Sequence, residues 1–413
     1  METRAKWTFM VYLAGDNNLS SAGEKDLVEM RRVGSTPEVN VVAEFDRVGN
    51  DHETMRYHIR NDGADEYTES LGETDSGDPE VLLDFIRWTA ARFPAERYAL
   101  VLWNHGGGWV PEELHKVARA MDMVDYSIRE ANERSSSSMG RVLFRTTIKK
   151  ILAHPSPAER AILSDDGTGH SLDTIELGRV LVETERILGQ KLDLLGMDAC
   201  LMSNLEVAYQ ARGFVRCIVA SEENEPNDGW PYDVVLGGLA ADPDQDAPDL
   251  AKHIVASYVR SYADRNYTGP VTQAALDVSQ TEILTKPLDA FSKLVTPRMS
   301  ETRSWVDEAL YRTQAHFRRH TLWDVAEVCA HLADVTDDDE VRQAAREVNA
   351  ALQPVNSSFV IAEGHLGAKV ERCGGITIYW PPRILHAISP YYKDVEFARK
   401  HQWLGLLEAY QGP

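Results

Sequence analysis

The feature that most limits the fold is an alternation of uninterrupted apolar runs with amphipathic segments of helical period. Short apolar runs without polar alternation are typical of strands that are covered on both faces. Amphipathic segments between them are typical of the helices that connect parallel strands. We therefore expect an α/β protein with a mostly parallel central sheet. The expected strands are residues 7–14, 39–45, 98–103, 192–197 and 217–220, and the expected helices are residues 22–33, 79–93, 172–189 and 203–212.

The pattern changes at two places along the chain. Residues 111–159 are polar and include a run of serines, which indicates an insertion with partial helix and a loop. Beyond residue 245 helical segments dominate, with further strands expected at 271–278, 359–362 and 375–380. We expect a first domain over residues 1–245 that carries the insertion. A smaller α+β region over residues 246–413 is expected to pack on it.

The charge of the chain limits its partners. The sequence has 65 acidic and 43 basic residues, which gives a formal net charge of -22. Such a field repels phosphate groups and anionic lipids, so we expect no nucleic acid and no membrane among the partners. It favours cationic ligands instead. An acidic surface also keeps an ordinary protein in solution, and we expect this to be the main reason for the charge.

The cysteines and the N-terminal segment favour a cytoplasmic protein, with a secreted protein that carries free cysteines as the alternative. The four cysteines show none of the spacings that are typical of zinc sites or of a disulfide framework, so neither is predicted. The apolar run at residues 7–15 follows Arg4 and Lys6, as in a signal peptide. Its residues are mainly aromatic and β-branched, so we interpret it as a strand. The cysteines are Cys200, Cys217, Cys329 and Cys373.

Two of the expected strands lead into residues that cysteine hydrolases need. His105 follows one strand in WNHGGGW, and Cys200 follows another in GMDAC. Reactive groups gather at the carboxyl ends of parallel strands, and neighbouring strands lie about 5 Å apart. A lone cysteine is usually a small buried residue, and the chain has 13 histidines. The joint position at two strand ends nevertheless favours a catalytic pair.

The expected chemistry is nucleophilic attack on a carbonyl carbon. An imidazolium and the N-terminus of a helix directly after Cys200 would stabilise its thiolate, and His105 would protonate the leaving amine. The backbone amides of Gly106 and Cys200 are candidates for the oxyanion hole. An esterase is excluded as the source of the HGGG motif, because the sequence lacks the GxSxG nucleophile motif.

Five sequence blocks together resemble the clostripain family of cysteine peptidases, in the clan of caspases and gingipains. The resemblance covers most of the chain, and its histidine and cysteine blocks are the specific part. It implies a caspase-like α/β/α sandwich, and it makes His105 and Cys200 the catalytic dyad without an obligatory third acid. The blocks are residues 7–19, 103–109, 193–202, 219–232 and 374–382.

The resemblance also implies a preference for Arg or Lys before the cleaved bond. Asp198, two positions before Cys200, corresponds to the residue that selects a basic side chain in this family. Strand periodicity places both residues on one side of the chain. Asp228 is a second candidate for this substrate pocket, and Glu222 or Glu223 could serve instead. A solvated acidic loop explains these last three residues equally well.

The predicted function is thus a cysteine endopeptidase that acts on peptides or proteins with basic residues through a covalent acyl-enzyme. No cofactor is predicted. Calcium dependence is known for some relatives, but the sequence has no loop with regularly spaced oxygen ligands. Relatives often cut themselves between the histidine and the cysteine. Basic residues in the insertion offer such sites at Arg134, Arg141, Arg145, Lys149 and Lys150.

Two other functions are compatible with the same residues. A non-catalytic module with the caspase-like fold would keep the acidic pocket and bind basic peptides without cutting them. Alternatively, Cys200 would be an oxidation-sensitive thiol, because the environment that stabilises a thiolate serves both roles. Peptide hydrolysis under reducing conditions separates the endopeptidase from both alternatives.

Overall fold

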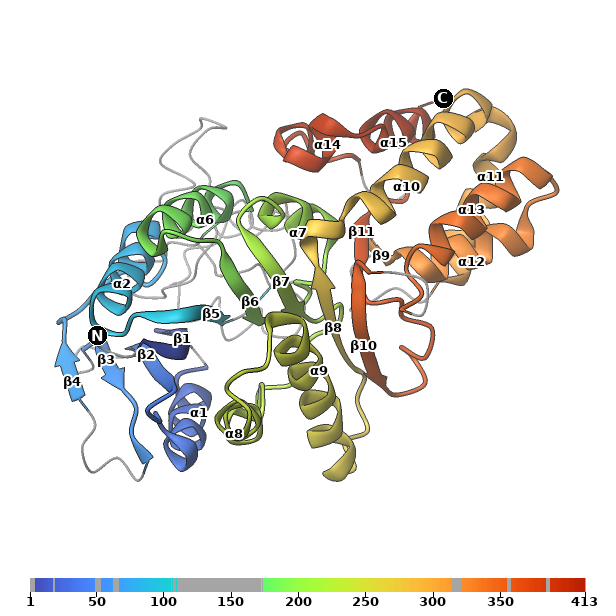
Figure 1. Cartoon of the computed structure of the whole chain (residues 1–413). Helices are drawn as coiled ribbons and strands as arrows, with labels where there is room; N and C mark the ends of the chain where they lie inside the picture. The colour runs from blue at the N-terminus through green and yellow to red at the C-terminus, as the bar shows by residue number, and fades with distance from the viewer. Residues whose placement is uncertain are drawn as a thin grey trace, which may run out of the picture.

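The computed structural model describes residues 4–17, 19–48, 53–61, 67–104, 106, 109, 172, 174–313, 321–354, 358–383 and 387–412. Within these residues the chain forms a nine-stranded sheet (Figure 1). Its strands lie in the order β10 (Val360–Leu366), β8 (Val271–Asp277), β7 (Val215–Ala220), β6 (Leu192–Asp198), β5 (Ala95–Trp103), β1 (Ala5–Gly15), β2 (Val39–Arg47), β3 (Met55–His58) and β4 (Tyr67–Ser70).

The centre of the sheet is parallel. The strands β7, β6, β5, β1 and β2 pair in parallel, whereas β3, β4, β8 and β10 are antiparallel additions at the two edges. Ten of the eleven residues of β1 are buried, which explains why its sequence shows no polar alternation. The predicted mostly parallel sheet is confirmed.

Helices cover both faces of this sheet (Figure 1). Successive residues of β1 point to opposite faces. Met10 belongs to one apolar core, which includes α2, α6 and α7, whereas Phe9 belongs to a second, which includes α1, α8 and α9. The expected α/β/α sandwich is confirmed. The covering helices are α1 (Ser20–Val33), α2 (Pro79–Arg92), α6 (Thr174–Leu188), α7 (Leu205–Ala211), α8 (Tyr232–Ala241) and α9 (Ala247–Asp264).

The rest of the C-terminal part forms a mainly helical body beside α7 (Figure 1). Its apolar side chains belong to the same core as those of α7. Because β8 and β10 lie in the central sheet, the two parts share one sheet, and a division at residue 245 stays a prediction. The body contains α10 (Glu282–Val295), α11 (Met299–Arg312), α12 (Val325–Val335), α13 (Asp339–Ala350), α14 (Glu396–Lys400), α15 (Trp403–Gln411), and a two-stranded sheet of β9 (Leu322–Asp324) and β11 (Thr377–Tyr379).

Two further predictions concern the insertion in the chain and the lack of a helix that could span a membrane. The predicted insertion at residues 111–159 lies outside the described residues. Among the helices that the structure describes, none combines the length and the apolar character needed to span a bilayer.

Candidate active site

The strands that precede His105 and Cys200 are direct neighbours. In the parallel pair of β5 and β6, Trp103 lies opposite Asp198. The pairing continues one residue further, because the Asn104 amide donates to the Asp198 carbonyl oxygen at 3.3 Å. The two chains therefore leave the sheet side by side at the same edge, where ligand sites of parallel sheets form.

The loop after β5 contacts the backbone of Cys200. His105 itself lies outside the described residues, so its distance from Cys200 stays a prediction. Gly106 is described, and a Cβ at this position would lie 2.1 Å from the Cys200 carbonyl oxygen and 2.7 Å from its nitrogen. Only glycine allows this approach. The residue after His105 therefore packs against Cys200, and the two amides predicted for the oxyanion hole belong to adjacent backbone segments.

Cys200 lies in a strained turn between β6 and α7. The next residue, Leu201, has a φ of 66°, a left-handed conformation that typically costs about 1–3 kcal/mol. Its amide donates to the Glu223 carbonyl oxygen at 3.2 Å, and the Cys200 thiol donates to the Glu225 carbonyl oxygen at 3.9 Å. The loop after β7 thus holds this turn in place, and Cys200 is only 4% exposed.

The helix after Cys200 begins later than predicted. We expected it at residue 203, directly after the nucleophile, but α7 begins at Leu205. Ser203 is held by β11 instead, because its carbonyl oxygen accepts from the Thr377 amide at 2.9 Å, and Asn204 forms a bridge with Thr377. A pairing with residues more than 170 positions away therefore delays the helix.

Asp198 forms a buried wall of a small cavity beside Cys200. Both residues line this cavity, which has a volume of about 30 Å³. Asp198 is 4% exposed, and its Oδ2 accepts from the Trp230 amide at 3.2 Å and from the Tyr232 hydroxyl at 2.9 Å. Burial raises the pKa of Asp198, although these two donors act in the opposite direction. The predicted placement on one side of the chain agrees with this arrangement.

A second acidic side chain lines the same cavity and was missed from the sequence. Glu225 is 7% exposed, and its carboxyl group forms a side-chain hydrogen bond with Asp198. Its Oε1 accepts from Gln273 Nε2 at 3.1 Å. Burial and the neighbouring Asp198 raise the pKa of Glu225 well above its usual value. No spacing rule relates residues 198 and 225, so the sequence carried no signal for this pair.

A third buried carboxyl group lies near this pair. Asp26 on α1 is 3% exposed, and burial together with the charge of Asp198 raises its pKa to about 9. Two carboxylates that lie close together in a buried site cannot both stay charged without a cation. Because the pKa of Asp26 lies at about 9, Asp26, Asp198 and Glu225 together carry fewer than three negative charges at neutral pH.

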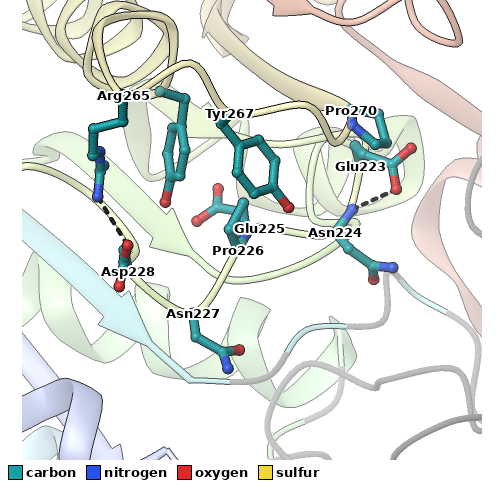
Figure 2. Close-up of a pocket in the computed structure, with 10 residues that line it drawn as sticks. Glu223, Asn224, Glu225, Pro226, Asn227, Asp228, Arg265, Tyr267 and Pro270 are labelled. Atoms are coloured by element: carbon teal, nitrogen blue, oxygen red, sulfur yellow. Dashed lines mark hydrogen bonds and ion pairs between the residues drawn. The ribbon is translucent and has the colours of Figure 1, made fainter.

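Asp228 lines a larger, neighbouring cavity of about 590 Å³ (Figure 2). Its carboxylate pairs with Arg265 at 2.9 Å and with Lys25 at 4.0 Å. Glu223 lines this cavity too, and burial raises its pKa to about 8. Residues 225–227 line both cavities, so this short segment separates them. A substrate-binding role for Asp228 stays a prediction.

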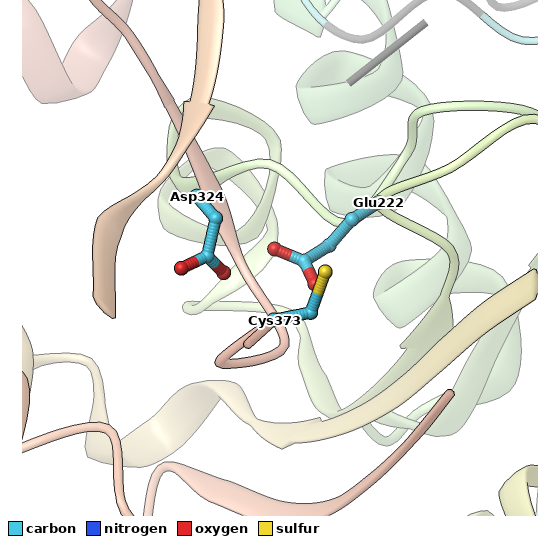
Figure 3. Close-up of side chains that lie close together, drawn as sticks. All are labelled: Glu222, Asp324 and Cys373. Atoms are coloured by element: carbon cyan, nitrogen blue, oxygen red, sulfur yellow. The ribbon is translucent and has the colours of Figure 1, made fainter. Parts of the chain in front are cut away.

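The last acidic candidate, Glu222, lines neither cavity. It lies against Asp324 and Cys373 at the junction with the C-terminal part (Figure 3). Of the acidic residues considered from the sequence, Asp198 is therefore the one that lines the cavity beside Cys200.

Comparisons with known proteins agree with this geometry. Clostripain from Hathewaya histolytica is 29% identical to this chain over 263 residues, which are 57% of this chain and 42% of that protein. This chain thus matches less than half the length of its curated relative. The fold is similar to a secreted C11 cysteine protease from Bacteroides thetaiotaomicron in complex with an irreversible peptide inhibitor. The TM-score is 0.64 at 18% identity, over 97% of this chain and 99% of that one.

A second solved structure, an inactive zymogen C11 protease from Parabacteroides distasonis, gives a TM-score of 0.63 at 18% identity, over 98% of this chain and 99% of that one. At these identities the two structures confirm the fold. The model of the clostripain family matches residues 11–127 and 150–410, which include both the histidine and the cysteine blocks. This chain belongs to the clostripain family of C11 cysteine peptidases.

Proposed function

We propose that this chain is an endopeptidase that cleaves peptide bonds after Arg or Lys, with Cys200 as the nucleophile and His105 as the proton carrier. The observation that supports this most strongly is the contact between Gly106 and the Cys200 backbone. It places the residue after His105 against the nucleophile, beside a cavity that Asp198 and Glu225 line.

The proposed reaction has two halves. The Cys200 thiolate attacks the carbonyl carbon, a C–S bond forms, and the electron pair of the C=O bond moves to oxygen. The amides of Gly106 and Cys200 stabilise this oxyanion, a contribution typically worth about 3 kcal/mol per donor. His105 protonates the leaving amine as the C–N bond breaks. Water, deprotonated by His105, then attacks the thioester, releases the carboxylic acid and regenerates the thiol.

The acidic cavity explains the proposed preference for basic side chains. A guanidinium or ammonium group that enters it would replace protons on Asp198 and Glu225 with charge-assisted hydrogen bonds. A neutral or acidic side chain would leave the carboxyl groups protonated and gain no such bonds. Substrate binding is therefore expected to release protons to solvent.

The cavity must open before a substrate side chain can enter. Its volume of about 30 Å³ holds one or two water molecules, far less than an Arg or Lys side chain needs. Residues 225–227 separate it from the cavity of about 590 Å³. Movement of this segment would join the two cavities. Self-cleavage within residues 111–159 is proposed separately, from the basic residues of that stretch of the sequence. The cytoplasmic location stays a prediction, and the Bacteroides thetaiotaomicron relative is a secreted protein.

Turnover of short peptides tests this function. We expect the full chain, under reducing conditions, to release a fluorophore from peptide amides that end in Arg or Lys, and to leave matched peptides that end in Glu or Ala intact. Cys200→Ala should abolish the release. Cys217→Ala is the matched control, because Cys217 is a buried cysteine within β7.

The alternatives predict different results in the same assay. A binding module would bind the basic peptides without turnover, and an oxidation-sensitive thiol would react with peroxide but release no fluorophore. Release that persists in Cys200→Ala, or the absence of release from every basic peptide, contradicts the proposed function.

A further inference from the structure

Three buried side chains from distant parts of the sequence meet outside the candidate active site. Glu222 follows β7, Asp324 ends β9, and Cys373 precedes β11. Their exposed fractions are 1%, 0% and 9%. One carboxylate oxygen of each acid and the sulfur atom all lie within 4.8 Å of one another, and Figure 3 shows the three side chains pointing toward a common centre.

This cluster concentrates negative charge in the interior. Besides burial, the largest influences on the Glu222 carboxyl are the carboxyl groups of Asp324 and Glu363, which repel its charge, and the Gly375 amide. Glu222 Oε2 accepts from that amide at 3.2 Å. Its Oε1 is completely buried and receives no hydrogen bond from an amide, hydroxyl or cationic group, and the neighbouring side chain with which Glu222 interacts is the carboxyl group of Asp324. A buried carboxylate oxygen without such a donor is costly unless a proton or a metal ion neutralises it.

We propose that Glu222, Asp324 and Cys373 bind one divalent transition-metal ion, with Zn²⁺ as the best match. Oxygen and thiolate donors together suit Zn²⁺, whereas Ca²⁺ and Mg²⁺ take oxygen ligands. In a tetrahedral zinc site with bonds of about 2.0–2.3 Å, neighbouring ligand atoms lie roughly 3.5 Å apart. The three atoms lie within 4.8 Å of one another, so a bound ion would have to draw them together by about 1 Å. A water molecule would supply the fourth ligand.

The backbone around the cluster holds the ligands in position. Asp324 Oδ1 accepts from the Glu327 amide at 2.6 Å, and its Oδ2 accepts from the Gly374 amide at 2.7 Å. A Cβ on Gly374 would lie 2.5 Å from Ala326 Cβ, so the turn after Cys373 packs tightly on the start of α12. Hydrogen bonds of this kind orient the ligands of metal sites.

The competing explanation for how the buried charge is neutralised is a proton shared by Glu222 and Asp324. Burial raises the pKa of Glu222 well above its usual value, and Asp324 acts in the same direction. Burial and the surrounding carboxylates also raise the pKa of Cys373. A shared proton neutralises only the carboxylates, whereas a metal ion would stabilise the carboxylates and the thiolate together. The two explanations therefore differ in the state of the sulfur atom.

The proposed metal site would connect the loop after β7 with the C-terminal part of the chain. Glu222 belongs to the loop after β7, which also contributes Glu225 to the cavity beside Cys200. Asp324 and Cys373 belong to β9 and to the turn before β11. A bound ion would fasten this loop to the C-terminal part. The three ligands lack any local spacing, which is why the sequence predicted no metal site.

The test measures metal binding in the full chain with Cys200→Ala and without an affinity tag, so that neither the nucleophile nor a tag binds metal. After treatment with a chelator, we expect about one equivalent of Zn²⁺ per chain in competition with a chromogenic chelator. Co²⁺ should give the absorption band of a cobalt–thiolate bond. Cys373→Ser should abolish this band and weaken Zn²⁺ binding at least tenfold, while the control Cys217→Ala should preserve both.

Three results would overturn the proposal: no stoichiometric Zn²⁺ binding, no thiolate band with Co²⁺, or equal binding in Cys373→Ser. Each would leave a shared proton as the explanation of the cluster. If Cys373→Ser does not fold, Glu222→Gln carries the same test, with a tenfold loss of Zn²⁺ affinity expected in a folded protein. Peptide hydrolysis is not a readout here, so failure of the metal site is separate from failure of the proposed function.

Discussion

Gly106 approaches Cys200 so closely that a Cβ would lie 2.1 Å from the Cys200 carbonyl oxygen. Gly106→Ala is therefore expected to push the loop after β5 away from the nucleophile. Misplacement of about 1 Å at a reacting centre can lower the rate roughly 100-fold, so we expect at least that loss in kcat/KM. Gly405→Ala is the control, because nothing lies within 4 Å of its Cβ position. Near-normal turnover in a folded Gly106→Ala protein would show that this contact is not required.

Removing the Tyr232 hydroxyl tests how Asp198 is held. Tyr232→Phe deletes a donor at 2.9 Å from Asp198 Oδ2. Because this donor favours the charged form, its loss should raise the pKa of Asp198 further. The lower-pH limb of the kcat/KM profile for Arg substrates should then move to higher pH. Tyr258→Phe is the matched control, since the buried Tyr258 hydroxyl has no hydrogen-bond partner. Identical profiles for the two variants would contradict the role of Asp198.

Glu225→Gln tests the second acid of the cavity. The Gln side chain keeps an acceptor for Gln273 but cannot become negatively charged. We expect KM for Arg and Lys peptides to rise about 10-fold with little change in kcat, which is the signature of lost binding energy. Calorimetry in buffers of different ionisation enthalpy should show fewer protons released when a basic peptide aldehyde binds. Unchanged KM and unchanged proton release would exclude Glu225 from recognition.

Asp228→Asn separates the two acidic candidates of the sequence. Asp228 pairs with Arg265 and is 55% exposed, so its charge is largely neutralised and screened. If Asp228 contributes to the substrate pocket, as the sequence predicts, Asp228→Asn should raise KM for Arg and Lys peptides about 10-fold, as the loss of a charged hydrogen bond would. A change of less than about threefold is what the loss of an exposed ion pair alone would give. A loss as large as that of Asp198→Asn would place Asp228 in the substrate pocket.

The buried carboxyl group of Glu206 is expected to make the free energy of unfolding depend on pH. It is fully buried, and burial raises its pKa to about 7 from an ordinary 4.5. The folded state therefore binds more protons than the unfolded state between these values, and the contribution of Glu206 to stability falls as pH rises through this window. Glu206→Gln removes this dependence. From pH 5 to pH 7, the free energy of unfolding of the variant should gain roughly 2 kcal/mol relative to wild type.

Urea unfolding at pH 5, 6 and 7 measures this difference, with the exposed Glu371→Gln as the control. A constant difference between Glu206→Gln and wild type across this range would mean that Glu206 is already charged in the folded protein.

Self-cleavage is tested by the mass of the purified chain. Wild type is expected to yield two fragments whose new end follows a basic residue between 134 and 150, whereas Cys200→Ala should stay intact. Wild type that stays intact while it hydrolyses peptides would show that activation does not need this cut.

The sequence predicted the features that depend on local pattern. Apolar runs without alternation located β5 and β6, and the carboxyl ends of parallel strands share one edge, so the approach of the loop after β5 to Cys200 followed directly. The start of α7 was misplaced because pairing with Thr377 overrides the local preference of Ser203 and Asn204 for a helix start.

The features that the sequence did not indicate depend on tertiary contacts. Glu225 meets Asp198 only because the loop after β7 folds back over the end of β6. Glu222, Asp324 and Cys373 come from three separate segments, and no motif with fixed spacing relates them. In the sequence alone, acidic residues that tertiary contacts bury cannot be distinguished from acidic residues of solvent-exposed loops.

The most direct test of the central claim is covalent labelling of the full chain with peptide electrophiles, under reducing conditions, followed by intact mass and peptide mapping. We predict a single adduct on Cys200, formed at least roughly 100-fold faster with Arg than with Glu next to the electrophile, as expected for recognition by buried carboxylates. Cys200→Ala should give no adduct. Labelling of a different cysteine, or equal rates with Arg and Glu, would contradict the account.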